Sequence, residues 1–160
     1  MQSNINTGRT RELGIGETEI ERRGLKLNCK APLTAVASID DAVVAGFGDG
    51  SLTFFRPSLA PVSKNIHKGV ILCMTEYKNG FISGGDDGRF VAITTNGDTT
   101  EIADFGTKWV DCVAASDEIV ACSSGSDVHL FEHEKSQRKV FQHQSTVGGL
   151  AFDKQGQRLA

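Results

Sequence analysis

The chain has 160 residues, of which 39% are apolar and 23% charged, and its formal net charge is −3. This composition is typical of a soluble globular domain, and a small acidic excess without a basic cluster argues against a nucleic-acid ligand. The sequence contains no apolar run near the roughly 20 residues of a membrane helix and no signal-peptide core. We therefore expect no membrane partner and a cytoplasmic location.

An interval of 38 residues organises most of the chain. Three segments align with one another without a gap: 43–57, 81–95 and 119–133. Their apolar residues form short β-branched and aromatic clusters between turn residues, without a helical stripe. A fixed period near 40, built from short strands, is typical of β-propeller blades. We predict an all-β protein in which three complete blades of four antiparallel strands and the start of a fourth form an incomplete ring.

In chain order, residues 1–21 come first and are polar and charged, which predicts a disordered N-terminal tail. The partial propeller then spans 22–160, with complete units at about 29–66, 67–104 and 105–142 and the start of the next at 143–160. One period before Ala60 to Ile66 lies Arg22 to Asn28, so we expect this stretch to be a fourth strand. In a closed ring it would join the last blade and link the two chain ends.

The second unit shows the four strands most clearly. They are expected at 70–76, 80–84, 89–95 and 99–104. Asn96-Gly97 is a two-residue hairpin turn whose residues accept positive φ. Gly50 and Gly88 follow Asp49 and Asp87, where a tight turn needs a left-handed backbone and an acidic acceptor for its own amides.

His67, Ser83 and Asp87 are spaced to form one hydrogen-bonded chain across the second unit. Two interpretations exist: a Ser–His–Asp catalytic triad, or a closed network that satisfies buried polar groups. The third unit replaces all three residues together, by Phe105, Ala121 and Gly125. This joint loss favours the structural network, and Asp87→Ala is then expected to lower stability by about 1–3 kcal/mol.

The repeat resembles the WD40 repeat. Residues 143–160 match the family's entry, first strand and following turn, and the Asp-Gly turn recurs at Asp49-Gly50 and Asp87-Gly88. The sequence pattern of residues 143–160 is similar to that of stand-alone bacterial WD40 proteins. The family's closing Trp-Asp pair is replaced in each unit, by Phe55-Arg56, Ile93-Thr94 and Phe131-Glu132.

The resemblance covers roughly residues 25–160 and implies a propeller of, commonly, about seven blades. It also identifies His67, Ser83 and Asp87 as three of the four members of the family's buried network, with Ile93 in place of the tryptophan. Because three complete units leave blade faces and strand edges uncovered, we interpret the chain as an N-terminal fragment of a longer protein. Self-association that completes a ring is the alternative.

Cysteine and histidine spacing predicts neither a metal site nor a cofactor. Cys29, Cys73, Cys112 and Cys122 show no C-x-x-C spacing and are expected to be small buried thiols, mostly in strands. His129 and His133 lie on a strand, where four residues span roughly 13 Å, too far for one metal ion. The single tryptophan, Trp109, occupies the repeat position of Leu33, Ile71 and Val147, so we expect it to pack in the core rather than serve as a binding anchor.

Three functions remain open. The favoured one is a non-catalytic scaffold that binds other proteins; the alternatives are a propeller enzyme with catalytic groups in missing blades, and a truncated, non-functional product. No catalytic, cofactor-binding or metal-binding residue is assigned. The partner surface is expected on the loops that enter the first strands and on the Asp-Gly turns, at Lys30, Phe47, Asp49, Lys68, Asp86, Arg89 and Lys108.

Overall fold

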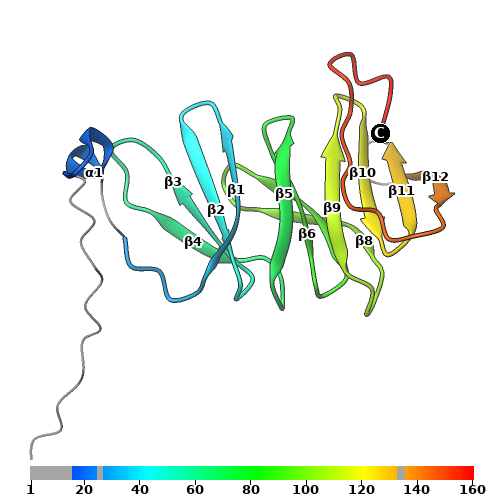
Figure 1. Cartoon of the computed structure of the whole chain (residues 1–160), viewed down its shortest axis with the longest axis horizontal. Helices are drawn as coiled ribbons and strands as arrows, with labels where there is room; N and C mark the ends of the chain where they lie inside the picture. The colour runs from blue at the N-terminus through cyan, green and yellow to red at the C-terminus, as the bar shows by residue number, and fades with distance from the viewer. Residues whose placement is uncertain (1–15, 25–26, 133–135) are drawn as a thin grey trace, which may run out of the picture.

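The computed structural model describes residues 16–24, 27–132 and 136–160. Within this part of the chain, the strands form three separate four-stranded antiparallel sheets, each built from strands that are consecutive in the sequence (Figure 1). The first sheet contains β1 (Leu33–Ile39), β2 (Ala42–Phe47), β3 (Ser51–Phe55) and β4 (Val62–Asn65). The second contains β5 (Ile71–Tyr77), β6 (Gly80–Gly85), β7 (Arg89–Thr94) and β8 (Thr99–Asp104). The third contains β9 (Val110–Ala115), β10 (Ile119–Ser124), β11 (Asp127–Glu132) and β12 (Ser136–Gln142).

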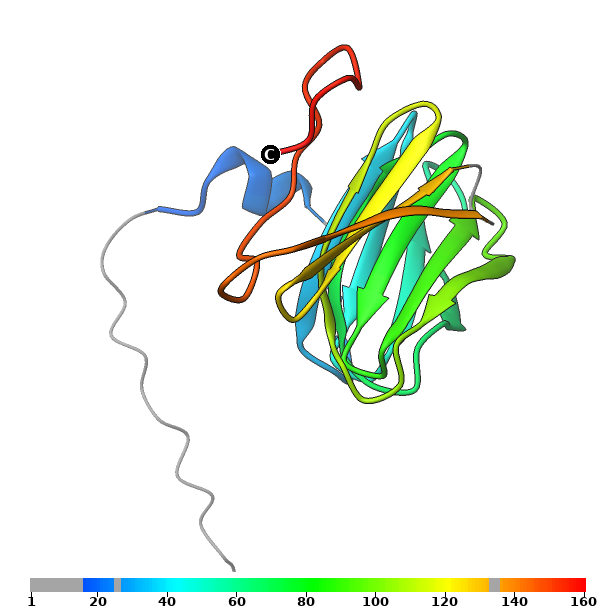
Figure 2. The same ribbon diagram turned by 90° about the vertical axis from the view of Figure 1, so that its right-hand side faces the viewer.

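The sheets lie side by side in an open row, and their first strands are neighbours: β1 lies next to β5, and β5 next to β9 (Figure 1). After a quarter turn the sheets overlap in projection, as expected for blades stacked face to face (Figure 2). The predicted all-β architecture of four-stranded antiparallel blades in an incomplete ring is confirmed. The described residues contain no helix that is both long and apolar enough to cross a membrane.

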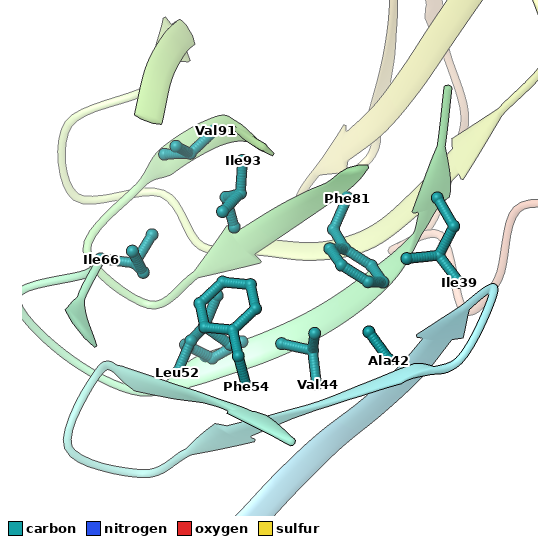
Figure 3. Close-up of a cluster of buried hydrophobic side chains, with 10 residues drawn as sticks. Ile39, Ala42, Val44, Leu52, Phe54, Ile66, Phe81, Val91 and Ile93 are labelled. Atoms are coloured by element: carbon teal, nitrogen blue, oxygen red, sulfur yellow. The ribbon is translucent and has the colours of Figure 1, made fainter. Parts of the chain in front are cut away.

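Strand pleating explains how each sheet presents apolar side chains to both neighbours. In β6, Phe81 and Ser83 point to the first sheet, whereas Ile82, between them, points to the third. Phe81 is 1% exposed and packs with Val44 and Phe54 of the first sheet (Figure 3). This alternation makes the second sheet a two-sided layer of the core.

The contact between the second and third sheets uses the other face of the second sheet. Ile82 and Phe90 pack with Val120 and Phe131, and each of the four is at most 3% exposed. The rings of Phe90 and Phe131 lie 5.8 Å apart at their centroids with an interplanar angle of 52°, a tilted arrangement that aromatic pairs favour. The core is therefore a series of inter-sheet layers.

The expected glycine turns are confirmed. Gly50, Gly88 and Gly97 have φ values of +80°, +78° and +78°, in the left-handed region. At Gly88 a Cβ atom would lie only 2.1 Å from the carbonyl oxygen of Gly106, so a side chain is also excluded sterically. The turn after β6 thus depends on glycine for both its conformation and its close packing.

The segment before the first sheet differs from expectation. Residues Glu19–Arg23 form a short helix, α1, so Arg22 and Arg23 are helical and do not begin a strand. A capping box explains this: the Glu21 amide donates to Thr18 Oγ1, and the Thr18 amide donates to a Glu21 carboxylate oxygen over 2.7 Å. The end of the expected strand is also wrong, because residues 27–28 are not in a strand, whereas 25–26 lie outside the described residues. Most of the predicted disordered tail, residues 1–15, also lies outside them.

The start of the fourth unit folds back beside the third sheet. Phe152 and Leu159 form an antiparallel bridge, and the backbones of Ala151 and Ala160 exchange two hydrogen bonds of 2.9 and 3.0 Å. The Cys112 thiol lies 3.6 Å from the Val147 carbonyl oxygen, which links this segment to β9. Residues 143–160 therefore continue the row, as predicted from the repeat.

Candidate functional site

The structure joins His67, Ser83 and Asp87 into one hydrogen-bonded chain. His67 lies in the loop between β4 and β5, Ser83 in the middle of β6, and Asp87 in the turn between β6 and β7. His67 Nδ1 lies 2.9 Å from Asp87 Oδ1, and His67 Nε2 lies 2.8 Å from Ser83 Oγ. The 20-residue separation in sequence between His67 and Asp87 closes because the loop before β5 and the turn after β6 lie at the same end of the blade.

The protonation state of the network follows from its surroundings. Burial lowers the pKa of His67 below its ordinary value, although the Asp87 carboxylate opposes this effect. Burial raises the pKa of Asp87, but hydrogen bonds from the Lys68 amide, His67 and the Arg89 amide outweigh it, so that the pKa lies below its usual range. A neutral His67 beside an ionised Asp87 carries its proton on Nδ1, and Ser83 donates its hydroxyl proton to Nε2.

This arrangement has the hydrogen-bond order of a catalytic triad but lacks access to a substrate. The side chain of His67 is 0% exposed, and Ser83 is 0% exposed as a whole residue. A serine nucleophile must approach a substrate carbonyl, whereas Ser83 Oγ lies between two packed sheets. The geometry therefore fits a closed network that satisfies three buried polar groups and anchors the turn after β6.

The residues expected to form a partner surface lie at one end of the blades, the lower edge in Figure 1. Lys30, Lys68 and Lys108 are exposed in the loops that lead into β1, β5 and β9. Asp49 is exposed in the turn between β2 and β3, where its carboxylate accepts hydrogen bonds from the Ser51 hydroxyl and amide, which lower its pKa. These four charged side chains are exposed to solvent at the loop end of the blades.

The other three members of the expected surface are less available. Phe47 is 5% exposed, so its assignment to the partner surface is wrong; it lies at the wall of a groove that Leu27 and Cys29 also line. The Arg89 guanidinium is already occupied, because Nε donates to Glu101 over 2.8 Å and Nη1 to the Ile66 carbonyl over 2.8 Å. Asp86 is half-buried.

Trp109 is 60% exposed, so the expectation that it packs in the core is wrong. The cause is a shift in strand register. The first pairs of these strands are Ile71 with Gly85 in the second sheet and Val110 with Ser124 in the third, and a one-residue bulge follows each pair. Both β9 and β10 therefore lie 39 residues after their counterparts β5 and β6 (110 − 71 and 124 − 85). One residue more than the 38-residue period separates β5 from β9, so β9 begins at Val110 and Trp109 lies in the loop before it, as Val70 does before β5.

Neither the thiols nor the imidazoles form a metal site in the described part of the chain. Cys29 is exposed and outside any strand, which corrects the expectation for that thiol, whereas Cys122 is buried. Burial raises the pKa of Cys73 to about 12, so its thiol is not reactive near neutral pH. No group of three or more potential metal ligands occurs among the described residues, and His133 lies outside them.

A second polar group was not predicted from the sequence. At the end of the third sheet where the chain enters β9, Ser123 Oγ donates to Asp111 over 2.7 Å. The adjacent Ser124 is 1% exposed, and its hydroxyl has no hydrogen-bond partner among the described residues. Together with Trp109 and Asp127, Asp111 and Ser124 line one pocket. The available sequence signal was the departure of the third unit from the Asp-Gly turn, with Gly125 in place of Asp87.

Comparison with known proteins supports the fold alone. No protein-family model matches the sequence, and no curated protein matches it. Among solved structures, the computationally designed Ika4 protein superimposes with a TM-score of 0.69 at 21% identity, over 82% of this chain and 88% of that one. The computationally designed Ika8 protein gives 0.67 at 21% identity, over 76% of this chain and 40% of that one. A chain of the mitotic checkpoint complex gives 0.72 at 12% identity, over 84% of this chain and 45% of that one. The match therefore covers less than half of the last two chains.

Proposed function

We propose that the chain is a non-catalytic, WD40-type protein-interaction module that binds partner proteins through the loops entering β1, β5 and β9. The observation that carries the proposal is the contrast between two sets of polar residues. His67, Ser83 and Asp87 are turned inward and satisfy one another, whereas the charged side chains at the loop end are exposed and available. A rigid scaffold with its variable groups on loops is suited to recognition.

Two further features support a role in protein binding. The fold is shared with a chain of a multiprotein assembly, the mitotic checkpoint complex. The exposed loop charges are of both signs, because Lys68 and Lys108 are positive and Asp49 is negative, which is typical of a surface that selects partners by electrostatic complementarity. Fold likeness alone does not fix function, so the proposal depends on a direct test.

The test compares two double variants in a capture experiment followed by an affinity measurement on the captured protein. Lys68→Ala/Lys108→Ala removes two charges from the loop end. The matched control, Asp117→Ala/Glu118→Ala, removes two exposed charges from the turn between β9 and β10, at the opposite end of the blade. We expect a protein bound by the wild type and the control to bind the loop variant at least about tenfold more weakly, as for the loss of charge pairs in an interface. Equal affinity of all three proteins for the partner would refute the loop-face assignment.

A separate experiment tests the absence of catalysis by the Ser–His–Asp group. A fluorophosphonate reagent labels activated serine nucleophiles, and we expect no labelling of Ser83 in the folded protein because its hydroxyl is fully buried. Labelling of Ser83 that disappears in His67→Asn would show an activated serine and favour the hydrolase alternative.

A further inference from the structure

The pocket beside Trp109 combines chemical groups that recognise a basic side chain. It has a volume of about 390 Å³ and is lined by Lys108, Trp109, Asp111, Ser124 and Asp127, among others. It lies at the loop end of the third sheet, where the chain enters β9 and turns from β10 into β11. We propose that this pocket binds an arginine side chain presented by an extended segment of a partner protein. This inference rests on the proposed function and specifies one site on its surface.

The aromatic ring is the first component of the site. Trp109 is a large apolar residue that is 60% exposed, and the one-residue shift before β9 places it there. Tryptophan offers the most favourable ring face for a cation, and a planar guanidinium can stack on it. An exposed tryptophan beside a pocket is also the residue type that most often dominates binding energy at protein interfaces.

The carboxylates are the second component. Asp111 and Asp127 both line the pocket and are half-buried, so part of each carboxylate remains available to a ligand. Asp111 is oriented by Ser123, whose hydroxyl donates to Oδ1 over 2.7 Å, and this bond leaves Oδ2 for another donor. Lys108 is exposed, and its flexible stem allows the ammonium group to turn to solvent. An arginine fork has five N–H donors to offer such acceptors, which a lysine ammonium cannot match in geometry.

The third component is an unsatisfied hydroxyl. Ser124 is 1% exposed, and its Oγ has no hydrogen-bond partner within the part of the chain that the structure describes. A buried polar atom without a partner is costly, commonly about 1–3 kcal/mol, and Ser124 is one of the residues that line the pocket. The adjacent Gly125 leaves open space: a Cβ atom there would meet no atom within 4 Å. The second sheet has no such opening, because Asp87 fills the corresponding turn with its hydrogen bonds.

The experiment uses the full chain, in which Trp109 is the single tryptophan, so its fluorescence reports directly on the pocket. Three capped peptides serve as probes: acetyl-Gly-Arg-Gly-amide, the same peptide with uncharged citrulline, and the same peptide with glutamate. We expect a saturable emission change with the arginine peptide, at least about tenfold weaker binding of the citrulline peptide, and no saturable change with the glutamate peptide. An equal response to all three peptides would overturn the proposal, and so would equally tight binding of free arginine amide, because that would indicate an amino-acid site.

Variants locate the binding. Asp127→Asn is expected to lower the affinity for the arginine peptide by about tenfold. The matched control Asp117→Asn, at the opposite end of the same sheet, is expected to leave this affinity unchanged. Trp109→Ala removes the reporter, so its loss of binding is measured by calorimetry. Undiminished binding by Asp127→Asn or by Trp109→Ala would overturn the site. If a captured partner depends on Lys68 and Lys108 but no arginine peptide binds, this inference fails alone; if the peptide binds but no protein partner exists, the proposed function fails alone.

Discussion

Replacing Asp87 by alanine is the most informative test of how the second blade is held together. The Asp87 side chain is 8% exposed and accepts three hydrogen bonds: from His67 Nδ1 over 2.9 Å, from the Lys68 amide over 2.9 Å and from the Arg89 amide over 3.2 Å. Alanine removes both carboxylate oxygens, and with them all three hydrogen bonds. The consequences differ between the three donors, because only the His67 side chain is sealed from water.

The magnitude follows from that difference. Leaving the buried His67 Nδ1–H without a partner costs about 1–3 kcal/mol, whereas the exposed Lys68 amide can bond to water and loses less. We expect the free energy of unfolding to fall by about 2–3 kcal/mol in total. For a domain of this length, each kcal/mol lowers the melting temperature by roughly 2–4 °C, so the expected decrease is about 4–12 °C.

The assay is urea and thermal unfolding followed by circular dichroism, with Asp49→Ala as the matched control. Asp49 occupies the same turn position one period earlier, but its carboxylate accepts its hydrogen bonds from the neighbouring Ser51, and it is exposed to solvent. We expect a much smaller change in the control. If Asp87→Ala and Asp49→Ala lowered the melting temperature equally, the buried contact to His67 would contribute nothing measurable and the reasoning would be refuted.

A triple variant separates a structural network from a chemical one. His67→Phe/Ser83→Ala/Asp87→Gly gives the second blade the residues of the third. Replacing all partners together by apolar groups avoids orphaned donors, so we expect this variant to be more stable than Asp87→Ala alone. A triple variant less stable than the single one would show that the polar residues stabilise the blade beyond satisfying one another.

Three further predictions follow from the same structure. The pKa of His67 lies below 6.5 in the folded state, so the unfolded state takes up a proton before the folded state does as the pH falls. The free energy of unfolding of the wild type should therefore decrease below pH 6.5, by up to about 1.4 kcal/mol per pH unit. In urea titrations, the free energy of unfolding of His67→Asn should depend less on pH. Phe81→Ala should lower the free energy of unfolding by about 3–5 kcal/mol, since Phe81 is 1% exposed between two sheets; a loss below 1 kcal/mol in denaturant titration would contradict that packing. Under native conditions iodoacetamide should modify Cys29 quickly and Cys122 only after unfolding, as peptide mass analysis would reveal, because the first is exposed and the second is buried with a raised pKa; equal rates would disprove the difference in burial.

The sequence by itself determined the blade architecture, because its information is local and repeated. Alternating apolar residues specify strands, and Gly50, Gly88 and Gly97 mark turns that side chains would obstruct. The positions of His67 and Asp87 could also be predicted, since a residue that enters one strand and a residue in the next turn lie at the same end of a blade. Local pattern and tertiary structure agree at these points.

Tertiary structure alone decided which repeated positions are buried. Leu33, Ile71 and Trp109 are equivalent in sequence, yet Ile71 is 0% exposed while Leu33 and Trp109 are 58% and 60% exposed. Ile71 packs against the first sheet near Gly46, whereas Leu33 has no preceding sheet in the described chain to cover it. Trp109 leaves the core because Val110, displaced by the register shift, packs against Gly84 instead. Burial depends on the neighbouring sheet and on strand register, neither of which is present in a single repeat.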